Sequence, residues 1–131
     1  RKVTYHGQLG RTDVAALLNK VRFGAVTFLP APNHVDAQPN KLFEYLSAGL
    51  PILASDFPLW KEILGERLAE YADPQDALSV ADAMKRLLSA DPEEQRLRSI
   101  EGQQRIVTEL NWDREYDRLK ALYERLLAEG D

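Results

Sequence analysis

The sequence predicts an α/β fold in which a parallel β-sheet is covered by helices on both faces. Short apolar runs at residues 25–29 and 52–54 have the length and the continuous hydrophobicity of buried parallel strands. Amphipathic helical patterns separate these runs, as they do where crossover helices join parallel strands. From residue 73 onward only helical patterns follow, so we also expect a helical C-terminal tail.

The composition is that of an ordinary globular domain, and it excludes several functions. The chain has 131 residues, 44% of them hydrophobic and 29% charged, which suits one domain with a single core. A formal net charge of −4 without a basic run argues against nucleic-acid binding. The absence of cysteine excludes disulfides, thiolate metal sites and cysteine nucleophiles, and two distant histidines do not predict a zinc site.

The first part of the chain alternates strand and helix signals. A β-like run at residues 3–6 is followed by two glycines, and Thr12 is placed to cap the first helix. Two prolines end the strand at 25–29, and a polar loop at 33–38 leads to a helix that Gly49 stops. The elements that we expect are strands at residues 3–6, 25–29, 52–54 and 68–71 and helices at residues 12–20, 39–48 and 58–64.

Capping signals divide the tail into three helices. Asp73 and Asp91 each precede a proline, and an N-cap followed by proline at the first helical position is a common helix start. The second of these helices should reach about Val107, and Asn111 caps a last helix over residues 111–131. That helix carries a stripe of Trp112, Tyr116, Leu119, Tyr123 and Leu126. We expect the stripe to pack, and Trp60 and Trp112 to lie in the core, because large aromatics at helical spacing are mostly buried.

The number of strands bears on whether the domain is complete. About four strands are expected, whereas a doubly wound, Rossmann-like sheet commonly has five or six. The sequence begins directly with a strand signal and without Met. Either one strand of the domain has no recognisable hydrophobic pattern, or further β/α units precede residue 1. We favour the second interpretation and expect residues 1–131 to form one domain that is incomplete at its N-terminus.

The helix at residues 39–48 is the chemically informative one. At 100° per residue its apolar side chains fall on one side, and Asn40, Lys41 and Glu44 fall on the other. A helix that starts at the carboxyl end of a parallel strand lies where α/β sheets bind ligands, and its free N–H groups suit a phosphate. Lys41 opposes the helix dipole there, and such a local conflict suggests a function. Glu44 can accept hydrogen bonds from two vicinal hydroxyls.

A plainer interpretation of these residues stays open. Lys41 and Glu44 are three residues apart, and charged pairs at this spacing commonly lie on the solvated face of a helix, where they add little to its stability. From the residues alone, a surface ion pair is the simpler explanation.

Residues 36–58 resemble the donor-binding signature of the family-4 retaining glycosyltransferases, which have the GT-B fold. That signature places two acidic residues eight apart, followed by a small-residue turn and a strand that ends in Ala-Ser. Asp36 and Glu44 have this spacing, and residues 45–55 follow in step. The sequence of residues 39–45, Pro-Asn-Lys-Leu-Phe-Glu-Tyr, is similar to that of a subgroup of the family common in bacterial gene clusters for cell-surface polysaccharides. The resemblance extends over nearly the whole chain.

The resemblance implies a role for each matching position. Glu44 would hold the ribose hydroxyls of a nucleoside diphosphate, and Asp36 would contact the transferred sugar, so these two acids are the catalytic candidates. Asn40 and Lys41 would lie at the helix start whose amides approach the diphosphate and the sugar. Leu9 would provide the backbone contact to the nucleobase.

The sequence departs from the family pattern near these positions. Asp36 replaces Glu, which shortens the reach by one methylene group. Pro39 and Lys41 stand where the family more usually has Gly and Pro. Pro39, a donor-binding candidate, has no N–H to donate to an anion, and Lys41 would compensate. The family's Arg/Lys pair that grips the diphosphate should lie upstream, and Arg1-Lys2 does not obviously match it.

By this resemblance, residues 1–131 are the C-terminal, nucleotide-sugar-binding part of a GT-B retaining glycosyltransferase. The full enzyme would move a sugar from a nucleoside-diphosphate donor to a hydroxyl acceptor, without a metal or another cofactor. Its partners would be the donor, the N-terminal domain of the same chain and, by peripheral contact, a membrane. We expect it in the cytoplasm, at the inner face of the membrane. The isolated piece should be inactive and prone to self-association, through either the stripe of the last helix left exposed or an uncovered sheet edge.

Two other classes of function stay open at this point. One is a non-catalytic α/β interaction module that uses the helical tail as its surface. The other is a sugar-nucleotide epimerase of the GT-B type. His34, in the loop before Asp36, either packs against the protein or contacts a sugar.

Overall fold

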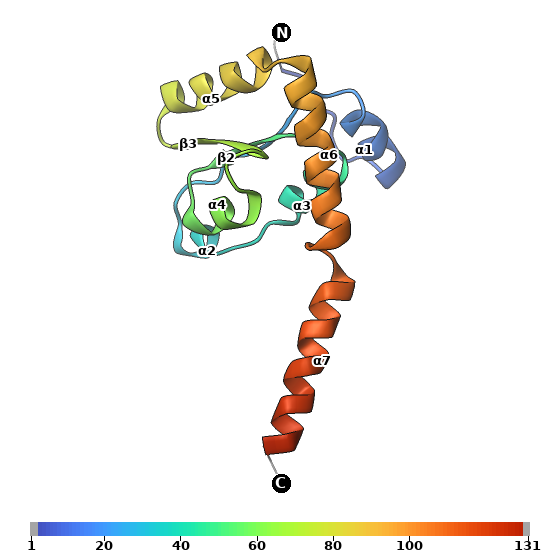
Figure 1. Ribbon diagram of the computed structural model, residues 1–131. Helices are drawn as coiled ribbons and strands as arrows, with labels where there is room; N and C mark the ends of the chain where they lie inside the picture. Colours follow the sequence, from blue (N-terminus) through green and yellow to red (C-terminus); the bar gives the residue numbers. More distant parts are fainter. Residues whose placement is uncertain (1–2, 130–131) are drawn as a thin grey trace.

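The computed structural model describes residues 3–129 and confirms the α/β fold with a parallel sheet, flanking helices and a helical C-terminal tail (Figure 1). Within that range the sheet has three strands, β1 (Gly24–Val26), β2 (Ile52–Ser55) and β3 (Ala69–Ala72), in the order β1-β2-β3. Both pairs are parallel, with Gly24 opposite Ile52 and Ile52 opposite Ala69. The carboxyl ends of these strands therefore lie at one edge of the sheet.

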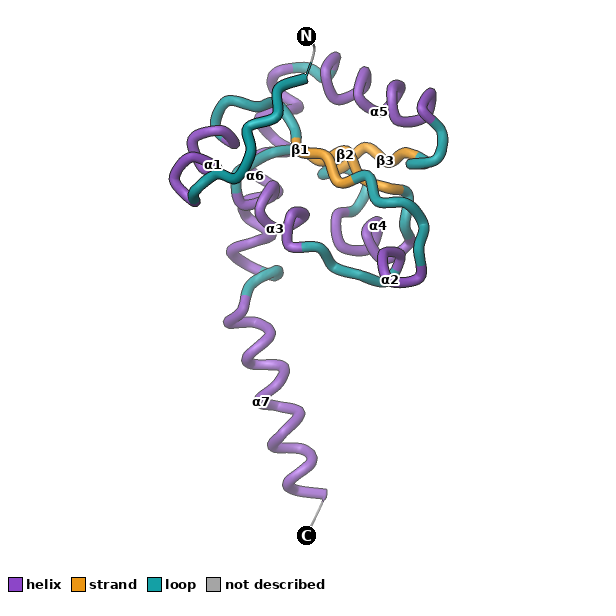
Figure 2. The backbone as a smooth tube through the Cα atoms, turned by 180° about the vertical axis from the view of Figure 1, so that it is seen from behind, coloured by secondary structure: helices purple, strands orange, loops and turns teal. Residues whose placement is uncertain are grey.

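Helices cover both faces of the sheet. The helices among the described residues are α1 (Arg11–Leu18), α2 (Pro32–Val35), α3 (Asn40–Ser47), α4 (Pro58–Leu64), α5 (Ala77–Ser89), α6 (Pro92–Thr108) and α7 (Trp112–Glu129). Helix α5 packs on one face, and α3 and α4 pack on the other (Figures 1 and 2). Helix α6 lies against α3, so α3 is held between the sheet and α6.

Two apolar clusters explain this layering. The larger one joins the sheet to α3 and α4 and consists of Val26, Leu42, Leu46, Ile52, Ala54, Phe57, Trp60, Leu64, Leu68 and Ala69. The smaller one joins the opposite face of the sheet to α5 and consists of Leu53, Ala72, Ala83 and Leu87. Along β2, Ile52 and Ala54 belong to one cluster and Leu53 to the other, as the two-residue period of a strand requires. Burial on both faces explains why this strand is continuously apolar.

Glycines let α3 approach its neighbours closely. A Cβ atom at Gly24 would overlap the ring of Tyr45, so α3 can lie over the start of β1 only because residue 24 has no side chain. Gly49 follows α3 with a φ of +69°, a left-handed value that favours glycine. Gly102 of α6 lies directly against Leu46 of α3. These contacts fix the position of the helix that carries the predicted binding residues.

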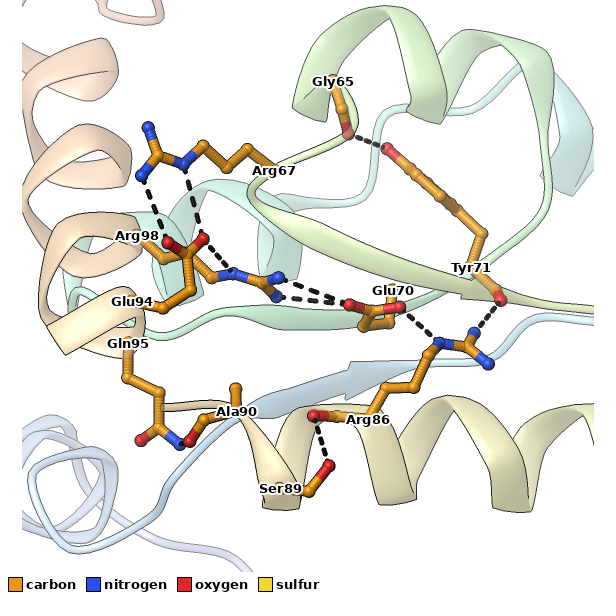
Figure 3. A network of polar contacts seen from close by, with 10 residues as sticks. All are labelled: Gly65, Arg67, Glu70, Tyr71, Arg86, Ser89, Ala90, Glu94, Gln95 and Arg98. Carbon is orange, nitrogen blue, oxygen red and sulfur yellow. Dashed lines mark hydrogen bonds and ion pairs between the residues drawn. The ribbon is translucent and has the colours of Figure 1, made fainter. Parts of the chain in front are cut away.

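An ion-pair network ties β3 to α5 and α6 (Figure 3). Glu70 accepts hydrogen bonds from Arg86 of α5 at 2.7 Å and from Arg98 of α6 at 3.4 Å. Arg98 also donates to Glu94 at 3.1 Å, and Arg67 pairs with the same carboxylate at 3.3 Å. The side chains of Arg98 and Glu70 are only 14% and 19% exposed, so water screens this pair less than an ordinary surface pair. The network connects α6 to the sheet.

The strand expected at residues 3–6 is wrong. Residues 3–9 form an irregular segment without a sheet partner among the described residues. Val3 and Tyr5 are 74% and 88% exposed, so the apolar side chains that suggested a strand have no face to cover. Strand propensity depends on such packing, and here it is absent.

Three boundaries near the predicted site also differ from expectation. Strand β1 covers Gly24–Val26 and ends three residues before the expected end at residue 29. Helix α1 begins at Arg11 after Gly10 as its N-cap, so Thr12 lies inside the first turn and does not cap the helix. The short helix α2 begins at Pro32 and takes up the first half of the expected polar loop at residues 33–38, because proline has a φ that suits a first helical position.

The start of α5 differs because a different aspartate caps it. Asp76 accepts a hydrogen bond at 2.8 Å from the amide two residues further on, and this bond starts the helix at residue 77. Asp73, the expected cap, makes the same kind of bond at 2.9 Å within the preceding turn. The caps at Asp91 and Asn111 are confirmed. Helix α6 ends at Thr108, close to the expected end.

Helix α7 extends away from the rest of the protein (Figures 1 and 2). Its stripe faces solvent within the described structure: Trp112 is 74% exposed, Tyr116 55% and Tyr123 61%. The expectation that this stripe packs and that Trp112 lies in the core is therefore wrong here. The expectation for Trp60 is confirmed, since its side chain is 0% exposed.

The expectations for Arg1-Lys2 and for the last two residues of the C-terminal helix lie outside the described residues. Between residues 3 and 129, none of the helices combines the length and the apolar character that crossing a membrane requires.

Candidate functional site

The connection between β1 and α3 carries most of the predicted site residues. It leaves the carboxyl end of β1, forms α2 and reaches the start of α3 at Asn40. Asp36 lies exposed at the C-cap of α2, and Pro39 stands at the N-cap of α3. Because ligands bind beyond the carboxyl ends of parallel strands, this connection lies where a ligand site is expected.

Three hydrogen bonds hold this connection in place. Ser55, fully buried at the end of β2, donates to the carbonyl oxygen of Phe28 at 2.8 Å. His34 Nδ1 bonds at 3.0 Å to the carbonyl oxygen five residues earlier, and its ring lies 4.9 Å from that of Phe28. Trp60 Nε1 donates to the carbonyl oxygen of Ala37 at 2.7 Å. These contacts favour packing over sugar contact as the role of His34.

The start of α3 offers backbone amides to an anion. Pro39 is the N-cap, with φ −68° and ψ 135°, and not the first helical residue as expected. The amide of Leu42 donates to the Pro39 carbonyl oxygen at 3.0 Å. By helix geometry the amides of Asn40 and Lys41 precede this bond and stay available. The missing N–H of Pro39 therefore removes neither of these two donors.

The faces of α3 are those that the periodicity predicts. Leu42 and Leu46 are buried against the sheet, whereas Lys41 and Glu44 are exposed. In the described structure no ion pair joins Lys41 to Glu44. Both charged groups face solvent and do not neutralise each other. Two exposed charges of opposite sign on one face can bind the opposite ends of a ligand.

A cleft of about 820 Å³ lies between α1 and the outer face of α3. It is lined by Leu9, Arg11, Val14, Ala15, Leu18, Asn19, Asn40, Phe43, Glu44, Ser47 and Ala48. The cleft brings together Leu9, Asn40 and Glu44, three of the predicted donor-binding residues. The α1 wall adds apolar side chains, and the α3 wall adds the carboxylate.

The other predicted residues, Asp36, Pro39 and Lys41, do not line this cleft. They lie next to it along the chain, at the C-cap of α2 and the start of α3. Sequence reasoning missed Arg11, which is exposed and lines the cleft at the first position of α1. The signal that could have found it is its place just after Gly10, where a helix starts beside Leu9.

A second hollow, of about 720 Å³, lies where α6 meets α7. Three arginines line it, but each already has a partner. Arg105 pairs with Glu109 at 3.2 Å, Arg118 pairs with Glu115 at 2.7 Å, and Arg114 donates to a backbone carbonyl oxygen at 3.0 Å. This hollow therefore presents less free positive charge than the number of its arginines suggests.

Tyr45 is the titratable neighbour of Glu44 on α3. Burial raises the pKa of Tyr45, and the negative charge of Glu44 raises that pKa further, so both effects favour the neutral phenol. Within residues 3–129 no group of three or more His, Cys, Asp or Glu side chains is placed to hold a metal ion.

The family model for the group 1 glycosyltransferases matches residues 1–90 of this chain. The match covers the connection from β1 to α3, both walls of the larger cleft and all of the sheet. The chain belongs to the group 1 glycosyltransferases. No curated protein matches it, and no solved structure does. The family implies glycosyl transfer from a nucleotide-sugar donor to an acceptor.

Proposed function

We propose that this chain binds the nucleoside-diphosphate sugar of a retaining, family-4 glycosyltransferase and forms the C-terminal, donor-binding half of a GT-B enzyme. The observation that carries the proposal is the cleft between α1 and α3, because it joins Leu9 to Asn40 and Glu44. The family resemblance assigns these residues to the base, the diphosphate and the ribose. At about 820 Å³ the cleft has the size of a small-molecule site.

The donor lies along α3 in this proposal. The base sits by Leu9 against the apolar wall of α1, and the ribose hydroxyls donate to the carboxylate of Glu44. The diphosphate continues past Asn40 to the amides at the start of α3, where the ammonium of Lys41 adds a positive charge. The sugar then reaches Asp36 at the C-cap of α2.

The chemistry follows from this placement. The bond between the anomeric carbon of the sugar and the diphosphate oxygen breaks, and that oxygen keeps the bonding electrons. The oxygen of an acceptor hydroxyl bonds to the anomeric carbon, and the hydroxyl proton passes to the leaving diphosphate. Negative charge builds on the leaving diphosphate, and the amides of Asn40 and Lys41 together with the Lys41 ammonium stabilise it. This assigns the catalytic work to positioning and charge stabilisation, without a metal or another cofactor.

The exposed stripe of α7 supports the proposal that the full enzyme has a second, N-terminal half. A row of large apolar side chains facing water is a surface that another part of a protein covers. We assign the N-terminal, acceptor-binding domain of the same protein to it. The full enzyme then acts in bacterial cell-surface polysaccharide or glycolipid synthesis, at the cytoplasmic face of the membrane and in peripheral contact with it. Without its other half, the chain uses this stripe for self-association.

One observation favours a different function. The same stripe suits a non-catalytic interaction module that binds a partner through α7. Under that alternative the α1–α3 cleft has no ligand, so nucleotide binding separates the two functions.

The test is a titration of the 15N-labelled chain with UDP, GDP and ADP, followed by amide NMR shifts. We expect one of them to shift the amides of Leu9, Asn40 and Glu44 together, because these residues share one cleft. Shifts confined to the hollow at the α6–α7 junction, or none with any of the three nucleotides, would contradict the proposal.

A further inference from the structure

We propose that Trp60 is a positioning residue that holds Asp36 toward the transferred sugar. The inference rests on the proposed function and adds to it a residue of α4 that lies beyond the binding signature at residues 36–58. Trp60 does not touch the ligand: its side chain is 0% exposed. It acts through the backbone next to Asp36.

The contact that carries the inference is the hydrogen bond from Trp60 Nε1 to the carbonyl oxygen of Ala37, at 2.7 Å. Ala37 directly follows Asp36. Its amide donates to the carbonyl oxygen of His34 at 3.2 Å. Both polar groups of Ala37 are therefore engaged, one within the connection and one with α4. This fixes the direction in which the chain leaves Asp36 on its way to α3.

The indole ring is itself held by two aromatic rings. Phe57 lies 4.8 Å away at 61°, and Phe28 lies 5.7 Å away at 66°, both in edge-on geometries that aromatic pairs prefer. Phe28 belongs to the same connection as Ala37, near its start. Trp60 thus contacts the connection between β1 and α3 at two places, its beginning and the residue after Asp36.

The hydrogen bond separates this role from simple core filling. A buried indole has one N–H donor, which needs an acceptor. In Trp60 that acceptor is the half-buried Ala37 of the connection between β1 and α3, and not a group of α4 itself. Glu44, in contrast, is held by the hydrogen bonds of α3 and by the packing of Leu42 and Leu46. Disturbing Trp60 should therefore affect the sugar end of the donor and spare the nucleotide end.

The experiment uses the full-length enzyme with a panel of UDP-, GDP- and ADP-sugars and the corresponding nucleoside diphosphates. We expect Trp60→Phe, which keeps an aromatic ring and removes the N–H, to lower kcat about tenfold, the effect of losing one buried hydrogen bond. The affinity for the nucleoside diphosphate should change less than about twofold. Incorporation of 3-benzothienylalanine at position 60 keeps the two-ring shape without the N–H. This variant should also lower kcat and leave the affinity for the nucleoside diphosphate nearly unchanged.

Phe57→Leu is the matched control. It removes an aromatic contact with the same indole ring and loosens the same core cluster, but it leaves the hydrogen bond to Ala37 in place. We expect this variant to lower the thermal stability and to leave kcat within about twofold of the parent below its unfolding temperature. A purely structural role for Trp60 predicts equal effects of the two substitutions.

A double-mutant cycle with Asp36→Asn supplies the decisive comparison. If Trp60 acts through Asp36, Trp60→Phe should lower kcat much less in the Asp36→Asn background than in the parent. Additive effects, or an unchanged kcat in both the Phe and the benzothienyl variants, would overturn the inference. The proposed function is tested separately, by whether a nucleoside diphosphate binds in the cleft lined by Leu9, Asn40 and Glu44. Nucleotide binding with additive Trp60 and Asp36 effects would overturn the inference alone, whereas absence of nucleotide binding would overturn the proposed function.

Discussion

Glu44 is exposed on the face of α3 that lines the cleft, while its neighbour Tyr45 turns inward over Gly24. Replacing Glu44 by Ala in the full-length enzyme should weaken binding of the nucleotide donor by about 2–3 kcal/mol, because two charge-assisted hydrogen bonds to the ribose are lost. Isothermal titration calorimetry measures the change. Glu66→Ala removes an exposed carboxylate away from the cleft and should leave the affinity unchanged. An unaltered affinity for Glu44→Ala with an intact fold would remove the ribose assignment.

Lys41 is assigned to the phosphates alone, and this makes a selective prediction. Lys41→Ala should weaken binding of the nucleoside diphosphate at least tenfold more than binding of the free nucleoside, since only the former carries the anion that the ammonium stabilises. Competition titrations with both ligands measure the ratio. Lys85→Ala on α5, whose ammonium pairs with Asp82, serves as the control. Equal weakening of the two ligands would show that Lys41 has a structural role only.

At the scale of elements, the sequence predicts well those helices and strands whose pattern lies within neighbouring residues. Helix α4 has the expected bounds, and β2 has continuous apolar character because both of its faces are buried. The strand at residues 3–6 failed because its side chains have no surface to cover. The α1–α3 cleft and the bond from Trp60 to Ala37 escaped prediction, since both depend on contacts between segments distant in sequence.

The fit of α3 over the sheet depends on Gly24. Gly24→Ala should destabilise the protein by about 1–3 kcal/mol, because the new methyl group would overlap the Tyr45 ring and displace α3. Urea unfolding measures the loss. The double variant Gly24→Ala/Tyr45→Ala should be less destabilised than the sum of the two single changes, as the clash is then absent. Strict additivity would mean that α3 does not rest on this contact.

The network between β3 and α6 makes stability depend on pH. Hydrogen bonds from Arg67 and then Arg98 lower the pKa of Glu94. A carboxyl group with a depressed pKa contributes stability above its unfolded pKa and loses it as the pH falls through its folded pKa. Glu94→Gln should therefore be less stable than the parent at neutral pH and approach it in acid, in urea unfolding at a series of pH values. Glu124→Gln on α7 is the control, and parallel profiles for Glu94→Gln and the parent would contradict the linkage.

For the whole molecule, the arrangement of the parts determines what the chain can do alone. In the proposed function the cleft, the start of α3 and Asp36 contact the donor. Helix α7, whose apolar stripe is exposed, extends away from the rest of the protein (Figure 1). In the proposed two-domain enzyme the acceptor is bound by the other half. The proposed donor site and the stripe of α7, to which we assign the acceptor-binding half, are thus separate features of this chain.

The 131-residue chain on its own should therefore show no glycosyltransferase activity. Transfer needs the anomeric carbon and the acceptor oxygen held within roughly 3–3.5 Å of each other, and a donor site alone cannot fix the second atom. The assay incubates the chain with UDP-, GDP- and ADP-sugars and follows both sugar transfer and release of nucleoside diphosphate against a buffer blank. The full-length enzyme under the same conditions is the positive control. Turnover by the isolated chain would overturn the two-half proposal, because the complete catalytic site would then have to lie within these residues.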